Sequence, residues 1–129
     1  MKHRRLSFSV CFFLLILGCG SSEIEVKGKV TIEGVPLSDG EIIFEDSKGL
    51  VTPVGTKIKN GEYTVLMLPG AKTVKIQASR PAKKIDPVMG SAAKEARIGP
   101  EFNTQSKLTA DIKPGPQPSL DFQVKELPK

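Results

Sequence analysis

The sequence is poor in the residue types from which most catalytic and metal sites are built. Its 129 residues include no tryptophan, one tyrosine, one histidine and two cysteines. The histidine, His3, and one cysteine, Cys11, both lie near the start of the chain. A chain that loses this segment on export lacks the usual ligands of zinc or copper. It also keeps a single cysteine, which excludes an intramolecular disulfide.

Aromatic residues and excess charge are scarce as well. Because Tyr63 is the sole tyrosine, a carbohydrate-binding face built on aromatic rings is disfavoured. The formal net charge is +5, from 19 basic and 14 acidic residues. Three of the basic residues lie in residues 1–18, so the remaining chain has 16 basic against 14 acidic residues, a net +2. We therefore predict no nucleic-acid partner.

The first eighteen residues have the composition of a secretory signal peptide. Lys2, Arg4 and Arg5 form a positive start, and an uncharged, mostly apolar run follows from Leu6 to Leu17. A transmembrane helix needs about 20 apolar residues, and this run ends after about a dozen. We predict that residues 1–18 are cleaved rather than kept as a membrane helix.

The end of this segment, Ile16-Leu17-Gly18-Cys19, resembles the lipobox of bacterial lipoproteins. The resemblance implies cleavage between Gly18 and Cys19, a diacylglyceryl group on the Cys19 thiol and an acylated N-terminus. The alternative is a simple signal peptide with a chance cysteine. As a lipoprotein, the chain is expected outside the cytoplasm, on the periplasmic face or the outer membrane. Residues 19–23 would form the tether, in which Gly20 to Glu23 reach roughly 14 Å.

The rest of the chain alternates apolar and polar residues in short stretches divided by turn residues. This period of two is typical of strands with one buried face. Between two such stretches, Asn60-Gly61 predicts a tight type I′ hairpin. We predict one all-β domain over residues 24–127, a single antiparallel, seven-stranded β-sandwich with strands at 24–32, 41–45, 50–59, 62–68, 72–79, 107–113 and 119–126.

Several of these stretches resemble the carboxypeptidase-regulatory-like, or transthyretin-like, β-sandwich domain. The resemblance rests on Gly28-x-Val30, Gly34-Val35-Pro36-Leu37, Asn60-Gly61-Glu62-Tyr63-Thr64-Val65, Leu68-Pro69-Gly70 and Val74-x-Ile76. It implies a Greek-key-like sandwich in which these residues serve the core and turns rather than chemistry. The segment from Pro100 to Leu108 is also similar to one in small lipoproteins abundant in planctomycete bacteria. Both resemblances imply architecture and location without an activity.

Residues 80–106 interrupt the strand pattern with prolines, glycines and a basic excess. Between residues 80 and 99, five basic residues face two acidic ones, a net +3. We predict a long basic loop. An ordinary solvated loop is the simpler interpretation, and contact with anionic lipid head groups or a partner protein is the functional alternative. The candidate contact residues are Arg80, Lys83, Lys84, Lys94 and Arg97.

Motifs for catalysis are weak. Ser91-x-x-Lys94 matches a short acylating-serine pattern without its companion motifs, and the carboxylates between Asp39 and Asp46 lack the spacing of a calcium loop. We therefore predict no catalytic residue, metal or cofactor. The predicted function is a non-enzymatic, lipid-anchored cell-envelope protein that acts as a structural or protein-interaction module. The alternative is a small extracytoplasmic binding protein that presents a peptide, glycan or ion through loop 80–106.

Overall fold

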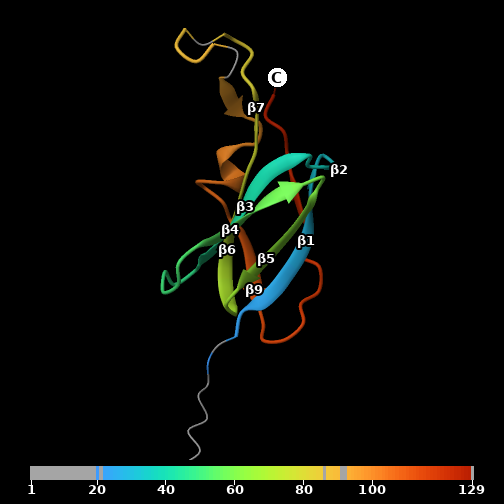
Figure 1. Ribbon diagram of the computed structural model, residues 1–129, viewed down its shortest axis with the longest axis vertical. Helices are drawn as coiled ribbons and strands as arrows, with labels where there is room; N and C mark the ends of the chain where they lie inside the picture. Colours follow the sequence, from blue (N-terminus) through green and yellow to red (C-terminus); the bar gives the residue numbers. More distant parts are fainter. Residues whose placement is uncertain (1–19, 21, 86, 91–92, 129) are drawn as a thin grey trace, which may run out of the picture.

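A computed structural model of the chain describes residues 20, 22–85, 87–90 and 93–128. The predicted signal peptide, its cleavage site at Gly18 and the lipidation site Cys19 lie outside these residues. The described chain is all-β, as predicted, and forms an elongated molecule from which a narrow hairpin projects at one end (Figure 1).

Ten strands and one short 3₁₀ turn make up the described secondary structure. In chain order they are β1 (Ile24–Ile32), β2 (Val35–Pro36), β3 (Asp39–Asp46), β4 (Val54–Lys59), β5 (Glu62–Met67), β6 (Gly70–Gln77), β7 (Ser79–Pro81), β8 (Lys94–Ala96), η1 (Pro100–Phe102), β9 (Leu108–Ile112) and β10 (Phe122–Val124). Seven of them follow one path, β10-β1-β5-β4-β3-β6-β9, with β2 paired to β1. This path curls into an open half-barrel.

The sheet is antiparallel at every neighbouring pair but one. β10 lies parallel to β1, with Val30 opposite Phe122 and Ile32 opposite Val124. The prediction of a wholly antiparallel sheet is therefore wrong at this edge. The connection of residues 113–121 runs from β9, at one edge of the path, to β10 at the other. Since alternation predicts which side chains are buried but not the direction of a partner strand, this pairing was invisible in the sequence.

The hairpin at Asn60-Gly61 is confirmed, and it is also where the sheet opens. Both residues have positive φ, 52° and 80°, as a type I′ turn requires. Beyond it, β4 and β5 share a single residue pair, Lys59 with Glu62. The two strands therefore diverge immediately after the turn, which lets the sheet curl around the apolar side chains.

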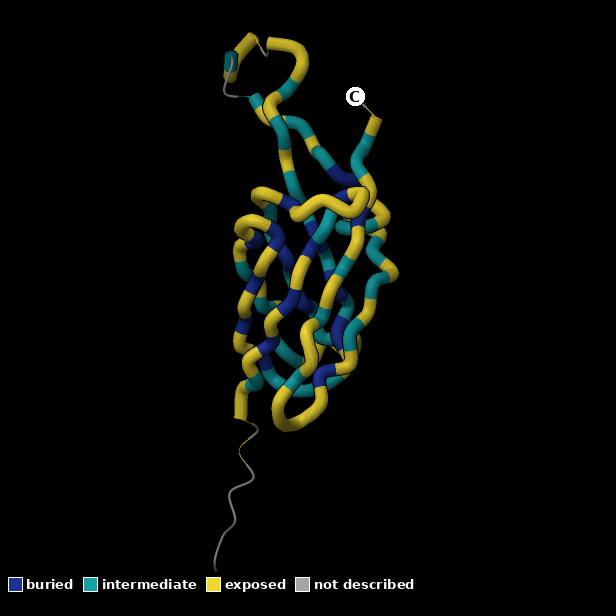
Figure 2. Tube along the Cα trace, turned by 90° about the vertical axis from the view of Figure 1, so that its right-hand side faces the viewer, coloured by how far each residue is buried: buried dark blue, intermediate teal, exposed yellow. Residues whose placement is uncertain are grey.

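The core lies inside this curl and uses the inward residues of the alternating strands (Figure 2). Leu37 joins it from a stretch predicted as loop, because its backbone N–H bonds the Val30 carbonyl at 2.9 Å. The buried apolar residues are Val26, Val30, Ile32, Leu37, Ile42, Phe44, Ile58, Tyr63, Val65, Met67, Val74, Ile76, Ile98, Ile112 and Val124. All of them fall between Val26 and Val124, so this part of the chain contains its own core.

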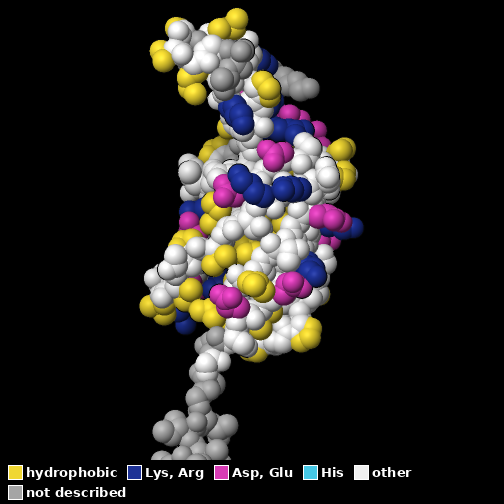
Figure 3. All heavy atoms as spheres, in the orientation of Figure 1, with side chains coloured by type: hydrophobic (Ala, Val, Ile, Leu, Met, Phe, Trp, Pro, Cys, Tyr) yellow, Lys and Arg dark blue, Asp and Glu magenta, His cyan; other side chains and the backbone are white. Residues whose placement is uncertain are grey.

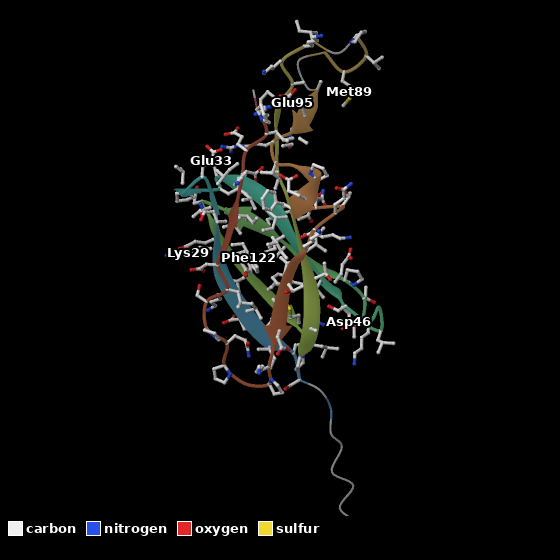
Figure 4. The ribbon with its side chains drawn as sticks, turned by 180° about the vertical axis from the view of Figure 1, so that it is seen from behind. Lys29, Glu33, Asp46, Met89, Glu95 and Phe122 are labelled. Atoms are coloured by element: carbon white, nitrogen blue, oxygen red, sulfur yellow. The ribbon has the colours of Figure 1, made fainter. Side chains whose placement is uncertain are left out.

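A close crossing at Gly28 locks the C-terminal segment onto β1. A Cβ at Gly28 would lie 1.8 Å from the Leu120 carbonyl oxygen, so only glycine fits there. The Tyr63 hydroxyl donates to the same carbonyl at 2.7 Å, and burial raises the Tyr63 pKa. Nearby, the Lys29 N–H donates to Asp121 at 2.9 Å, just before Phe122 (Figure 4).

One lysine lies on the core face of the sheet. Lys72 shares the inward parity of Val74 and Ile76 on β6 and is only 3% exposed. Its ammonium lies 3.5 Å from Asp46 on β3, and the Leu50 N–H donates to the same carboxylate. These hydrogen bonds, the one from Leu50 above all, hold the Asp46 pKa below its usual range. The pair fixes the turn between β3 and β4 to β6.

The region predicted as one long loop contains a second, smaller sheet. β7 and β8 pair antiparallel, with Arg80 opposite Glu95, so the prediction of a continuous loop over 80–106 is corrected. η1 then packs against β6. The β7–β8 hairpin projects beyond the half-barrel, at the end opposite to the start of β1 (Figure 1).

Candidate functional site

The two arginines among the predicted contact residues are used inside the molecule. Arg80 donates through Nε to Glu95 at 2.7 Å and through Nη1 to Glu126 at 3.2 Å. It also donates to the carbonyls of Leu127 and Pro128, at 3.2 and 3.1 Å. The Glu95 bond lowers the pKa of that carboxyl and raises the pKa of Arg80. Only 17% of the Arg80 side chain is exposed, so it is poorly placed to bind a partner.

Arg97 extends the same cluster to the C-terminal segment. Its Nε lies 3.2 Å from Glu126, and the Leu127 N–H donates to the Arg97 carbonyl at 2.9 Å. Ile98 also forms an isolated bridge with Glu126. The base of the β7–β8 hairpin is therefore clamped by the end of the chain, and both arginines have a structural role.

The outer part of the hairpin is exposed and combines apolar with basic residues. We call Lys83, Lys84, Ile85, Val88 and Met89 the hairpin tip. Lys83 and Lys84 are exposed, and the three apolar side chains are 80%, 94% and 62% exposed in that order. Figure 4 labels Met89 beside the loop that joins β7 and β8, and Figure 3 shows apolar side chains gathered at the end of the molecule formed by the hairpin.

The last predicted contact residue, Lys94, lines a separate cleft at the base of the hairpin. This cleft has a volume of about 390 Å³ and lies between the ends of β3, β4 and β6 on one side and β8 and residues 98–103 on the other. Its charged side chains are Asp39, Glu41, Lys57 and Lys94. Two acidic and two basic residues leave it without net charge.

An ordered amide lies on the wall of this cleft. The Gln77 Nε2 donates to Glu41 at 2.7 Å, while its Oε1 accepts from Asn103 at 3.3 Å. A side chain held at both ends is preorganised, which lowers the entropic cost of contacting a ligand. The cleft can hold a small polar molecule, and its lining includes no aromatic ring on which a sugar would stack.

The carboxylates weighed for calcium do not converge. Glu41 holds Gln77, Glu45 pairs with Lys75 at 2.7 Å, and Asp46 pairs with Lys72. Throughout the described residues, no group of three His, Cys, Asp or Glu side chains could hold a metal ion. In that same part of the chain, no helix is long and apolar enough to cross a membrane.

The apolar tip was missed by the sequence reasoning, which considered only charge in this region. A signal was present, because Ile85, Val88 and Met89 stand close together in a segment of turn residues with no strand period. Comparisons with other proteins add no further guide: no family model matches the chain, and no curated protein or solved structure is significantly similar to it.

Proposed function

We propose that this chain is a lipid-anchored, extracytoplasmic protein of the bacterial cell envelope, and that it acts as a non-enzymatic structural or interaction module. The observation that carries the proposal is the β7–β8 hairpin. It presents three large apolar side chains to solvent, at 62–94% exposure, on a base fixed by ion pairs. Exposed apolar clusters on soluble domains are typical of protein or membrane contact sites.

The anchor is supported by the lipobox-like run ending at Cys19 and by the position of the first described residues. β1, which begins at Ile24, starts at the end of the molecule away from the hairpin (Figure 1). With a tether of roughly 14 Å, the body would stay close to the bilayer. Two or three acyl chains suffice for stable anchoring without help from the folded domain.

For the fold, we propose a Greek-key-like β-sandwich of the carboxypeptidase-regulatory-like kind. Its support is the single residue pair between β4 and β5, which divides the path into β10-β1-β5 and β4-β3-β6-β9. Side chains from both groups meet in the core, for instance Tyr63 of β5 and Phe44 of β3, whose ring centroids are 6.0 Å apart. The proposal also follows the resemblance of the segment from Pro100 to Leu108 to planctomycete-type lipoproteins.

The mass of the mature protein, isolated from membranes of a bacterium that processes lipoproteins, tests the anchor. We expect a chain that starts at Cys19 and carries acyl groups, and a Cys19→Ser variant that keeps residues 1–18. A chain that starts at an unmodified Cys19, or a wild type that keeps residues 1–18, would contradict the anchor.

A second candidate function is a small binding protein, and the cleft beside Lys94 specifically favours it. The cleft lies between the sheet and residues 80–106, the region predicted to present a ligand. Lys94 and Asn103 line it on one side and Gln77 on the other. We expect a bound peptide to shift the amide NMR signals of Gly40, Gln77 and Ala96. Screening short peptides against the labelled protein checks this, and unshifted signals with every peptide would remove a peptide as the ligand of this cleft.

A further inference from the structure

We infer that the hairpin tip inserts into the surface of an anionic bilayer, so that the domain lies along the membrane with an attachment at each end. This inference rests on the proposed lipid anchor for the first attachment. The second attachment depends only on the hairpin, and its test is independent of the lipid.

The first observation is the chemistry of the tip. Ile85, Val88 and Met89 expose apolar side chains, and Lys83 and Lys84 directly precede them. Apolar side chains flanked by lysines are suited to a bilayer interface, where the apolar groups enter the acyl boundary and the ammonium groups stay among the head groups.

The second observation is how the charges of the hairpin are distributed: they are paired at its base and exposed in its outer part. The two arginines pair with Glu95 and Glu126 at its base, so that Lys83 and Lys84 are the exposed charges among the described residues of its outer part. From Ala82 to Lys94 the sequence has three lysines and one carboxylate, Asp86, a net +2. Asp86 lies outside the described residues. A positive net charge complements anionic head groups, near which each basic residue is attracted within a Debye length.

The third observation is where the two attachments lie. In the view of Figure 2, the start of β1 and the hairpin lie at opposite ends of the long axis but toward the same side of the molecule. The nine residues of β1 span about 30 Å at about 3.3 Å each, and the hairpin projects beyond the half-barrel at the end opposite to the start of this strand, so the two points are well separated. A flat membrane surface along that side can therefore contact both the hairpin and the start of β1. It could not do so if the hairpin pointed to the other side of the molecule.

Vesicle flotation of the unlipidated chain, residues 20–129, tests the tip alone. This piece contains every buried apolar residue of the described chain, from Val26 to Val124. We expect it to float with vesicles that contain about one third phosphatidylglycerol in phosphatidylcholine, and to bind pure phosphatidylcholine at least about tenfold more weakly. Added salt should weaken binding to the anionic vesicles.

Two variants separate the apolar and the charged contributions. Ile85→Ser, Val88→Ser and Met89→Ser together should lower partition into anionic vesicles by about tenfold or more at any salt concentration. Lys83→Gln with Lys84→Gln should lower it by about tenfold and remove most of the salt dependence. The matched control is Lys48→Gln with Leu50→Ser, which alters an exposed lysine and an exposed leucine in the β3–β4 turn and should bind as the wild type does.

Each other result overturns the inference. Wild type that stays in solution, equal binding to neutral and anionic vesicles, or equal losses in the control variant would all do so. A photocrosslinker at position 88 in cells that joins a protein, combined with no vesicle binding, would make the tip a protein contact instead. None of these results bears on the lipid anchor, which the mass of the mature chain decides separately.

Discussion

The half-barrel and the β7–β8 hairpin are both antiparallel β-structures, but they are held together by different forces. The half-barrel encloses fifteen buried apolar side chains. Among the described residues of the hairpin, from Ser79 to Arg97, no side chain is buried. The hairpin depends instead on its backbone pairing and on the cluster of Arg80, Glu95, Arg97 and Glu126.

This difference teaches that the two regions should respond to different perturbations. A two-stranded hairpin is marginal by itself in water. Ion pairs near the surface contribute little stability and are screened by salt. Apolar burial contributes more and is not screened in this way. Loss of core packing should therefore unfold the whole chain, whereas loss of the ion pairs should release the hairpin and leave the half-barrel intact.

Phe44→Ala should have the largest effect on the half-barrel. Phe44 is fully buried and packs against Tyr63 with ring centroids 6.0 Å apart, so its loss leaves a cavity. We expect the free energy of unfolding to fall by about 3–5 kcal/mol, measured by urea denaturation. Leu50→Ala, at an exposed side chain in a turn, is the control and should change it little. A loss below about 1 kcal/mol at Phe44 would mean that this core is not tightly packed.

Gly28→Ala should be the next most damaging, because the added methyl group has no room. It would meet the Leu120 carbonyl and displace the Tyr63 hydroxyl that bonds it. We expect a loss of about 1–3 kcal/mol in the free energy of unfolding, together with weaker amide protection in β10. Gly20→Ala, where no atom lies within 4 Å, serves as the matched substitution. Equal stability of the two variants would show that the C-terminal crossing is looser than described.

Arg80→Gln should open the hairpin without unfolding the half-barrel. The substitution removes the charge that binds Glu95 and Glu126, so Glu95 loses this ion pair and Glu126 keeps the one with Arg97. We expect hydrogen exchange at the Ala82 and Arg97 amides to accelerate, while the Ile42 and Val74 amides stay protected. Lys27→Gln, in an exposed pair with Glu25, is the comparison and should alter neither region. Faster exchange throughout the protein would refute the separation of the two regions.

Acid should have the smallest and most local effect. The Arg80 hydrogen bond lowers the Glu95 pKa below its ordinary value of 4.5, so Glu95 stabilises the folded hairpin above that pH. This stabilisation is lost as the pH falls through the folded pKa. We therefore expect the Ala82 and Arg97 amides to lose protection from hydrogen exchange below about pH 4.5, before the half-barrel unfolds. NMR measurement of the exchange rates over a pH series checks this. A Glu95→Gln variant should lose this pH step, and an unchanged step would assign it to another group.

Much of the half-barrel was predictable because its signals are local. Alternation along 24–32 and 62–68 marked the buried faces, and Asn60-Gly61 fixed a hairpin that the positive φ values confirm. The same parity places Lys72 on the core face beside Val74. Alternation failed in the segment 33–40, where Leu37 is buried. Its N–H donates to Val30 of β1, and its carbonyl accepts from Gly61, which lies far along the chain.

The candidate sites were less predictable because they depend on distant partners. From the sequence, Arg80 and Arg97 were candidates for contact with a membrane or a partner. In the structure, Glu126, far along the chain, binds both. It could not place Gln77 between Glu41 and Asn103, which come from three separate segments.

By itself, the sequence determined the all-β class, the buried face of strands with clear alternation such as 24–32, the Asn60-Gly61 turn and the shortage of metal ligands, since each depends on residue type or on neighbours in the chain. Only the tertiary structure decided that β10 lies parallel to β1, that the basic segment pairs as β7 and β8, and that its exposed end is apolar as well as basic. The physical reason is that these features depend on long-range pairing and solvent exposure, which arise only when distant segments compete for the same partners.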